Sequence, residues 1–111
     1  MSVARVTSDF WVAAYLRRCA VEGVVAVLRR RGAAEAGAII IKVDRLDGTS
    51  VLLGPAPQSE AGEDGARAFA PLHRDAVIES LAAEERLKRE TAFDPDLWIV
   101  EVEDRAGRAF L

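Results

Sequence analysis

Four acidic residues near the C-terminal end of the chain have a spacing that could bring carboxylates together. Asp94 and Asp96 flank one proline, and Glu101 and Glu103 share one side of the strand expected after it. Because Mg²⁺, Mn²⁺ and Ca²⁺ need several oxygen ligands around one point, these residues form a candidate metal site. The alternative is structural: the Asp-Pro-Asp turn bonds to its own backbone, and the glutamates pair with arginines across a sheet.

A second group of candidate residues is basic and lies in the first third of the chain. Guanidinium groups bind phosphates and carboxylates through two parallel hydrogen bonds, so Arg17, Arg29 and Arg31 are candidate anion-binding residues, with Arg18 and Arg30 beside them. The alternative is that these arginines form ion pairs with the acidic second half of the chain.

The two halves of the chain carry opposite net charge. Residues 1–50 hold eight Lys and Arg against five Asp and Glu, whereas residues 51–111 hold seven against thirteen. Such halves are expected to attract each other within one fold or between two copies. The overall pI of about 5.2 argues against nucleic-acid binding as the main function, because phosphate neutralisation needs a concentrated basic surface.

Catalytic chemistry has little support in the sequence. Cys19 and His73 are the single Cys and His of the chain, and Cys19 lies on an apolar helix side, where a thiol is usually inert. Glycine-rich phosphate loops, a Gly-x-Ser-x-Gly elbow and a Cys-x-x-Cys motif are lacking, and no cofactor is expected. Glu84 and Glu85 remain candidates for acid–base chemistry, since apolar surroundings raise a carboxyl pKa.

The first predicted helix is apolar on two sides. One side carries Val12, Tyr15, Leu16 and Cys19. The other side carries Phe10, Trp11, Ala14, Arg17 and Arg18. A helix that is apolar all round is covered on both sides, and aromatic residues with arginine are typical of interface anchors. The second side therefore predicts a homodimer interface. The alternative is that another segment of the same chain covers this side of the helix.

The first half of the chain predicts one helix and three strands. Ser8 or Asp9 suits the N-cap of a helix that runs to about Ala20. A strand over Val24–Leu28 follows Gly23, although one long helix over Phe10–Arg31 is the alternative. The clearest strand is Ala38–Leu46, which Asp47-Gly48 turns into a return strand over Val51–Leu53. Val3–Val6 is predicted to form a further short strand.

The second half predicts a loop, a helix and a final strand. Residues 54–65 read as a flexible loop, and Ala66–Ala70 as a short strand. Asp75 is expected to cap a helix that runs to Thr91 with Val77, Ile78 and Leu81 as its apolar stripe. Leu97–Glu103 alternates as a strand, with Trp98, Val100 and Val102 on one side, and Arg108–Leu111 is predicted to pair back onto it. The fold class is α+β, with two helices on a mostly antiparallel sheet in a single domain over residues 1–111.

Several short segments together resemble a known family. They are Phe93-Asp94-Pro95-Asp96-Leu97-Trp98, the following Val100-Glu101-Val102-Glu103-Asp104, Trp11-Val12 with Leu16-Arg17-Arg18, and Arg31-Gly32 with Ala36-Gly37. The combination resembles a bacterial family known only as domain of unknown function 1491, over nearly the whole chain. The resemblance implies a compact cytoplasmic domain and no known activity.

The N-terminal sequence predicts a cytoplasmic protein without a membrane segment. The apolar stretch Phe10–Leu16 has seven residues, which is too short to span a bilayer, and Asp9 precedes it. We therefore expect a small non-enzymatic protein-interaction module that self-associates. The alternatives are a metal-dependent or acid–base enzyme built on the C-terminal carboxylates, and a weak nucleic-acid or phosphate binder built on the N-terminal arginines.

Overall fold

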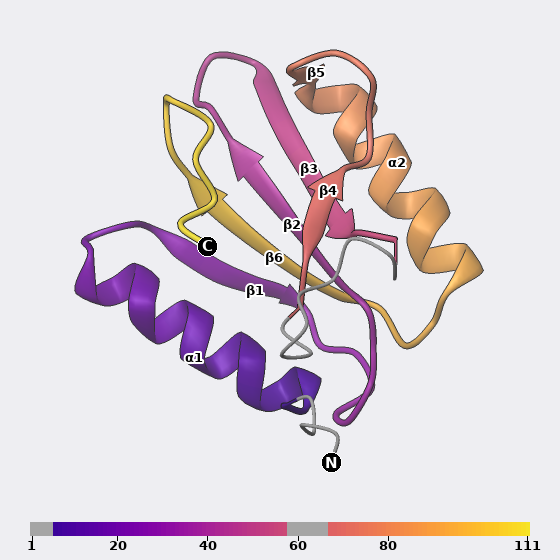
Figure 1. Ribbon diagram of the computed structural model, residues 1–111. Helices are drawn as coiled ribbons and strands as arrows, with labels where there is room; N and C mark the ends of the chain where they lie inside the picture. The colour runs from indigo at the N-terminus through magenta and orange to yellow at the C-terminus, as the bar shows by residue number, and fades with distance from the viewer. Residues whose placement is uncertain (1–5, 58–66) are drawn as a thin grey trace.

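Two helices and a six-stranded sheet make up residues 6–57 and 67–111, which the computed structural model describes (Figure 1). In chain order the elements are α1 (Ser8–Val21), β1 (Ala26–Arg30), β2 (Ile39–Asp44), β3 (Thr49–Pro55), β4 (Phe69–Pro71), β5 (Ile78–Glu79), α2 (Ser80–Phe93) and β6 (Trp98–Glu103). The architecture is α+β, as predicted. Neither described helix is long and apolar enough to cross a membrane.

The last strand of the chain lies inside the sheet rather than at its edge. The strand order is β1-β6-β2-β3-β4, and β5 pairs with β3. β6 runs parallel to β2 and antiparallel to β1, and the remaining pairs are antiparallel. The connection through α2 makes this parallel pairing possible, because two parallel strands need a crossover between them. The sheet is therefore mostly antiparallel, as predicted.

The helices cover opposite faces of the sheet, because alternate residues of the central strands belong to different cores. The core under α1 contains Val12, Tyr15, Cys19, Ile39, Ile41, Val43, Trp98, Val100 and Val102. The core under α2 contains Ile40, Leu52, Ala83, Leu87, Leu97 and Ile99. The predicted alternation of the final strand is confirmed, and so is the buried side of the first helix.

The first helix starts and ends differently from the prediction. Thr7 is the N-cap, and Ser8 is already helical, with its buried hydroxyl donating a 2.6 Å hydrogen bond to the carbonyl oxygen of Gly37. Gly23 follows the helix with φ of 73°, a left-handed conformation that closes helices. The chain then enters β1, so helix followed by strand is correct, and the single long helix is wrong.

The second helix also begins later than predicted. Asp75 does not cap it, because Ile78 and Glu79 form β5 and pair with β3 before the helix starts at Ser80. Leu81 is exposed, and the buried side is made by Ala83 and Leu87 instead. Strand pairing with β3 therefore overrides the local helix signal of residues 75–79.

The predicted hairpin is present, and its return strand is longer than expected. Gly48 adopts φ of 88° in the turn, and β3 continues through Pro55, into the segment predicted as loop. β4 occupies Phe69–Pro71, close to the predicted short strand. Arg108–Leu111 forms no strand, Val6 lies in none, and the rest of the predicted N-terminal strand and residues 58–65 lie outside the described residues.

The loop between β1 and β2 packs without spare room against the start of β6. The indole Nε1 of Trp98 donates a 2.7 Å hydrogen bond to the carbonyl oxygen of Ala33. A Cβ on Gly32 would collide with the backbone carbonyl of Asp96 and lie 2.6 Å from Cδ1 of Trp98, and Gly37 is crowded by the same two residues. These glycines are therefore required by close approach rather than by backbone conformation.

We predict that Gly32→Ala lowers the free energy of unfolding by about 3 kcal/mol, because the added carbon has no free volume and meets rigid backbone. Gly48→Ala is the matched control: its Cβ meets nothing within 4 Å, so it costs only the left-handed conformation, about 1 kcal/mol. Denaturant unfolding measures both variants. Equal losses would contradict the packing argument.

Candidate functional site

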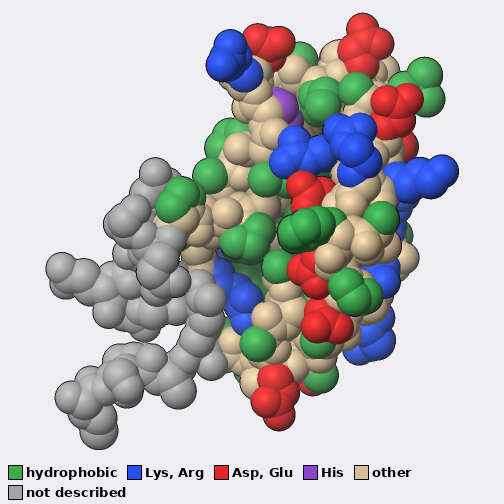
Figure 2. Space-filling model, turned by 90° about the vertical axis from the view of Figure 1, so that its right-hand side faces the viewer, with side chains coloured by type: hydrophobic (Ala, Val, Ile, Leu, Met, Phe, Trp, Pro, Cys, Tyr) green, Lys and Arg blue, Asp and Glu red, His purple; other side chains and the backbone are tan. Residues whose placement is uncertain are grey.

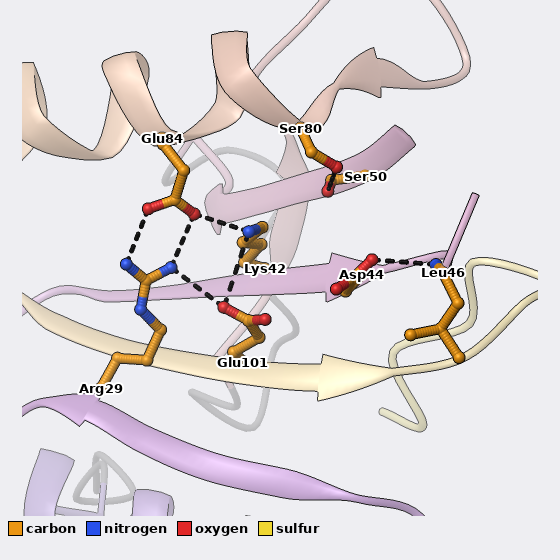
Figure 3. A network of polar contacts seen from close by, with 8 residues as sticks. All are labelled: Arg29, Lys42, Asp44, Leu46, Ser50, Ser80, Glu84 and Glu101. Carbon is orange, nitrogen blue, oxygen red and sulfur yellow. Dashed lines mark hydrogen bonds and ion pairs between the residues drawn. The ribbon is translucent and has the colours of Figure 1, made fainter. Parts of the chain in front are cut away.

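Four charged side chains from three strands and one helix form an ion network on the α2 side of the sheet (Figure 3). Glu84 on α2 accepts from Arg29 on β1 at 2.7 Å and from Nζ of Lys42 on β2 at 2.6 Å. Glu101 on β6 accepts from Arg29 at 2.9 Å and lies 3.6 Å from Nζ of Lys42. The network links α2 to the three strands at one edge of the sheet.

Lys42 explains why the network forms. Ile41 and Val43 on either side of it point into the α1 core, so Lys42 points to the α2 side, where its side chain is only 7% exposed. A buried ammonium group requires carboxylate partners, and the parallel register places Glu101 directly beside it. Arg29 and Lys42 come from the basic half of the chain, and both glutamates come from the acidic half, so the two halves neutralise each other here.

The network also determines the protonation of Glu84. Hydrogen bonds from Arg29, followed by those from Lys42, lower the pKa of this carboxyl from an ordinary 4.5 to about 2. Acid–base catalysis near neutral pH requires the opposite shift, so that a proton is available to give. Glu84 is therefore a permanently ionised partner of two cations at neutral pH.

The four carboxylates predicted as a metal site do not converge. Asp94 ends α2, and its Oδ1 accepts from the backbone N–H of Asp96, as expected for a structural Asp-Pro-Asp turn. Glu101 belongs to the ion network, and Glu103 ends β6, about 20 Å from Asp96 along an extended strand. Among the described residues, no three Asp, Glu, His or Cys side chains are grouped as a metal ion requires.

The three arginines predicted to bind anions lie on different surfaces. Arg29 is occupied by the ion network, and the guanidinium of Arg31 lies 5.3 Å from the ring centre of Trp98. Arg17 is exposed on α1 and forms no ion pair with any described residue. The structure does not bring these guanidinium groups together around one anion.

Cys19 and His73 occupy separate surroundings. Cys19 is buried in the α1 core, and burial raises the pKa of its thiol. His73 uses both ring nitrogens on the backbone: Nε2 accepts from the amide of Leu52, and Nδ1 donates to the carbonyl oxygen of Asp75. Neither ring nitrogen is therefore available to activate the thiol.

The outer side of α1 is apolar and uncovered by the described chain. Phe10 is 64% exposed and Val21 is 82% exposed, and Ala14 between them is exposed as well. Arg17 completes this row, whose spacing of four, three and four residues places all of them on one helix face. We call Phe10, Ala14, Arg17 and Val21 the α1 outer face. It contains three of the five residues predicted as an interface.

The other two predicted interface residues, Trp11 and Arg18, line a hollow beside this face. Trp11 stacks on Tyr15 with ring centres 5.1 Å apart and contacts Phe69 of β4 at 5.2 Å. The hollow between α1 and β4 has a volume of about 450 Å³. Its lining consists of Val6, Phe10, Trp11, Ala14, Tyr15, Arg18, Arg67, Phe69 and Leu111. We call it the aromatic hollow.

The opposite side of the molecule has a different character. Over α2, acidic and basic side chains lie interspersed, and neither sign forms a separate patch (Figure 2). Phe93 at the end of this helix is 89% exposed, yet no aromatic cluster surrounds it. Phe93 is therefore a suitable control for Phe10, because it is an exposed aromatic residue that lies away from α1.

Sequence reasoning missed several residues of these sites, among them Lys42, Arg67 and Phe69. The role of Lys42 could have been predicted, because a lysine within an apolar strand requires a carboxylate on its own side of the sheet. The roles of Arg67 and Phe69 could not, since these residues reach α1 only through strand pairing between β3 and β4. Arg67 donates to the carbonyl oxygen of Val6 and to the hydroxyl of Ser8, which ties the segment before β4 to the start of α1.

Comparison with known families and structures gives one consistent result. A family model described as "Protein of unknown function (DUF1491)" matches residues 6–111. A comparison with curated proteins finds no match.

Solved structures of similar proteins extend this result to three dimensions. The crystal structure of a DUF1491 family protein from Caulobacter crescentus is 36% identical, with a TM-score of 0.78, covering 96% of this chain and 92% of that one. An NMR structure of a DUF1491 family protein from Caulobacter crescentus is 38% identical, with a TM-score of 0.76 and the same coverage. Protein Atu0922 from A. tumefaciens is 38% identical, with a TM-score of 0.74, over 90% of this chain and 86% of that one.

We predict that Glu84→Gln lowers stability at pH 7 by about 1 kcal/mol, a modest value because the Glu84 side chain is 40% exposed and screened by water. The folded pKa is depressed, so the stabilisation by Glu84 is complete above about pH 4.5 and is lost as the pH falls toward about 2. Unfolding curves of wild type and variant should therefore converge in acid. Glu85→Gln, which alters an exposed neighbour, is the control, and a constant difference at all pH values would contradict the assignment.

Proposed function

This chain belongs to the DUF1491 family of proteins of unknown function, and from its surface chemistry we propose that it is a small non-enzymatic protein-interaction module that self-associates through the α1 outer face. The observation that carries the proposal is Phe10, an aromatic side chain 64% exposed at the N-terminal end of the α1 outer face. Exposed aromatic residues beside arginine are typical of the residues that dominate binding energy at interfaces.

The sequence of the α1 outer face suits a second copy of the same helix. Phe10 lies one turn before Ala14, and Arg17 lies about one turn after it. A two-fold axis near Ala14 places Phe10 of each copy against Arg17 of the other, and the small alanine allows the helices to approach closely. A parallel arrangement would instead place the arginines of both copies together, so the antiparallel arrangement is favoured.

Charge near the ends of α1 supports the same arrangement. Asp9 lies beside Phe10, and hydrogen bonds from Thr7 and from the amide of Phe10 lower the pKa of its carboxyl. In an antiparallel pair this ionised carboxylate lies at the same end as Arg17 of the second copy. Opposite charges that meet at the rim of an interface favour the correct orientation of the two partners.

Non-enzymatic function is supported by the contacts of the candidate catalytic groups. Glu84 is held ionised between two cations, and the Cys19 thiol is buried with a raised pKa. Both ring nitrogens of His73 are bonded to backbone groups. These groups therefore have structural partners in place of a substrate.

We predict that Phe10→Arg converts the self-associated protein to monomer, because it replaces an apolar contact with a guanidinium group facing Arg17 of the second copy. Light scattering should give twice the chain mass of 12.0 kDa for the wild type well above micromolar concentration, and 12.0 kDa for the variant. Phe93→Arg is the matched control, since this exposed aromatic residue lies on α2. A wild type that remains at 12.0 kDa, or equal effects of both variants, would contradict the proposal.

We further predict that Ala14→Cys forms a disulfide between two copies under mild oxidation. Helices that cross at a small residue have axes about 8 Å apart, which brings the two introduced thiols within bonding reach. Ala20→Cys is the control, because Ala20 is exposed on a different side of the same helix. Non-reducing gel electrophoresis distinguishes the two variants, and the buried Cys19 provides the background. Equal cross-linking of both variants would rule out the antiparallel contact.

A further inference from the structure

The aromatic hollow lies next to the α1 outer face but has a chemistry of its own. Trp11, Tyr15 and Phe69 make its walls, and the volume of about 450 Å³ is in the range of small-molecule sites. Trp11, Ala14 and Arg18 are spaced by three and four residues, so one side of the helix supplies both an aromatic ring and a guanidinium group. Phe10 and Ala14 belong to both the hollow and the α1 outer face.

Among the described residues that line the hollow, Arg18 supplies a positive charge and none has a carboxylate side chain. Arg18 forms no ion pair with a described residue, and its hydrogen bond to the carbonyl oxygen of Phe110 is long, at 3.5 Å. Arg67 lines the hollow beside Phe69 and is held by Val6 and Ser8. The positive charge of Arg18 therefore complements an anion, and its fork of N–H donors suits a planar carboxylate.

We propose that the aromatic hollow binds a small organic acid, in which a carboxylate that pairs with Arg18 is attached to a compact apolar body that fills the space between Trp11, Tyr15 and Phe69. The apolar walls exclude inorganic anions as good ligands, because phosphate would lose water without gaining contacts there. The volume of about 450 Å³ favours a small molecule over a protein segment. The hollow shares Phe10 and Ala14 with the α1 outer face. The carboxylate pairs with Arg18, which lies outside that face, so acid binding does not require self-association.

The probe is 3-phenylpropionate, and its matched control is the neutral alcohol 3-phenylpropan-1-ol, which has a body of the same size. Calorimetric titration of the full chain should detect the acid and give roughly tenfold weaker binding of the alcohol, because only the acid forms a charged hydrogen bond. NMR signals of the Trp11 indole should shift with the acid. Equal affinity for acid and alcohol, or no shift at Trp11, would overturn the proposal.

Two exposed arginines give a matched pair of variants. Arg18→Gln should weaken binding of the acid roughly tenfold and leave binding of the alcohol unchanged. Arg89→Gln should leave both unchanged, because Arg89 lies on α2 and does not line the hollow. Both arginines are exposed, so melting temperatures should match the wild type and verify folding. Equal losses in both variants would point to general surface charge and overturn the assignment to Arg18.

Other occupants appear as distinct outcomes. Phosphate that binds as tightly as the acid, or a peptide with a free carboxyl terminus that binds much more tightly, would overturn the proposal of a small organic acid. Light scattering of the same samples separates the two proposals. If the protein is a monomer and binds the acid, only the self-association proposal is contradicted. If it is a dimer and does not bind the acid, only the organic-acid proposal is contradicted.

Discussion

The sheet can bury only one side of α1, yet two sides of this helix are apolar. Val12, Tyr15 and Cys19 fill the core and fix the helix against β2 and β6. Phe10 and Val21 then remain exposed, because a helix that packs on one sheet can turn only one of its two apolar sides toward the core. The proposed interaction surface is thus a consequence of how the core is formed. Its exposure reflects the limited number of layers in a chain of 111 residues.

Charge is neutralised where the fold brings distant segments together. Lys42 is forced to the α2 side by strand alternation, and Glu101 meets it because β6 inserts beside β2 in parallel. Glu84 and Arg29 complete the network from α2 and β1. The attraction between the basic and acidic halves is therefore mainly local, through four side chains, and it leaves the arginines of α1 without an ion-pair partner among the described residues. The paired charges of the ion network therefore have a structural role, whereas the arginines of α1 lie on a surface that can bind a partner.

Local sequence predicts most of the fold, and long-range pairing decides the remainder. The hairpin around Gly48 and the alternation from Trp98 to Val102 follow from turn chemistry and the period of a strand, and both are confirmed. The predicted start of α2 was wrong because residues 78–79 pair with β3, and no local sequence pattern predicts that pairing. The same limit applies to the site. Phe10 can be recognised from the helix period alone, whereas Phe69 reaches Trp11 only through the sheet.

The claim on which the proposed function depends is that a second copy covers Phe10. Isotope-filtered NMR on a mixture of labelled and unlabelled chains measures this directly, because it detects only contacts between copies. Cross-peaks should connect the Phe10 ring of one copy with protons of α1 in the other, and the Ala14 methyl groups with each other. If a concentrated mixed sample gives no such cross-peaks, or places them on α2 around Phe93, then α1 is not the surface of self-association.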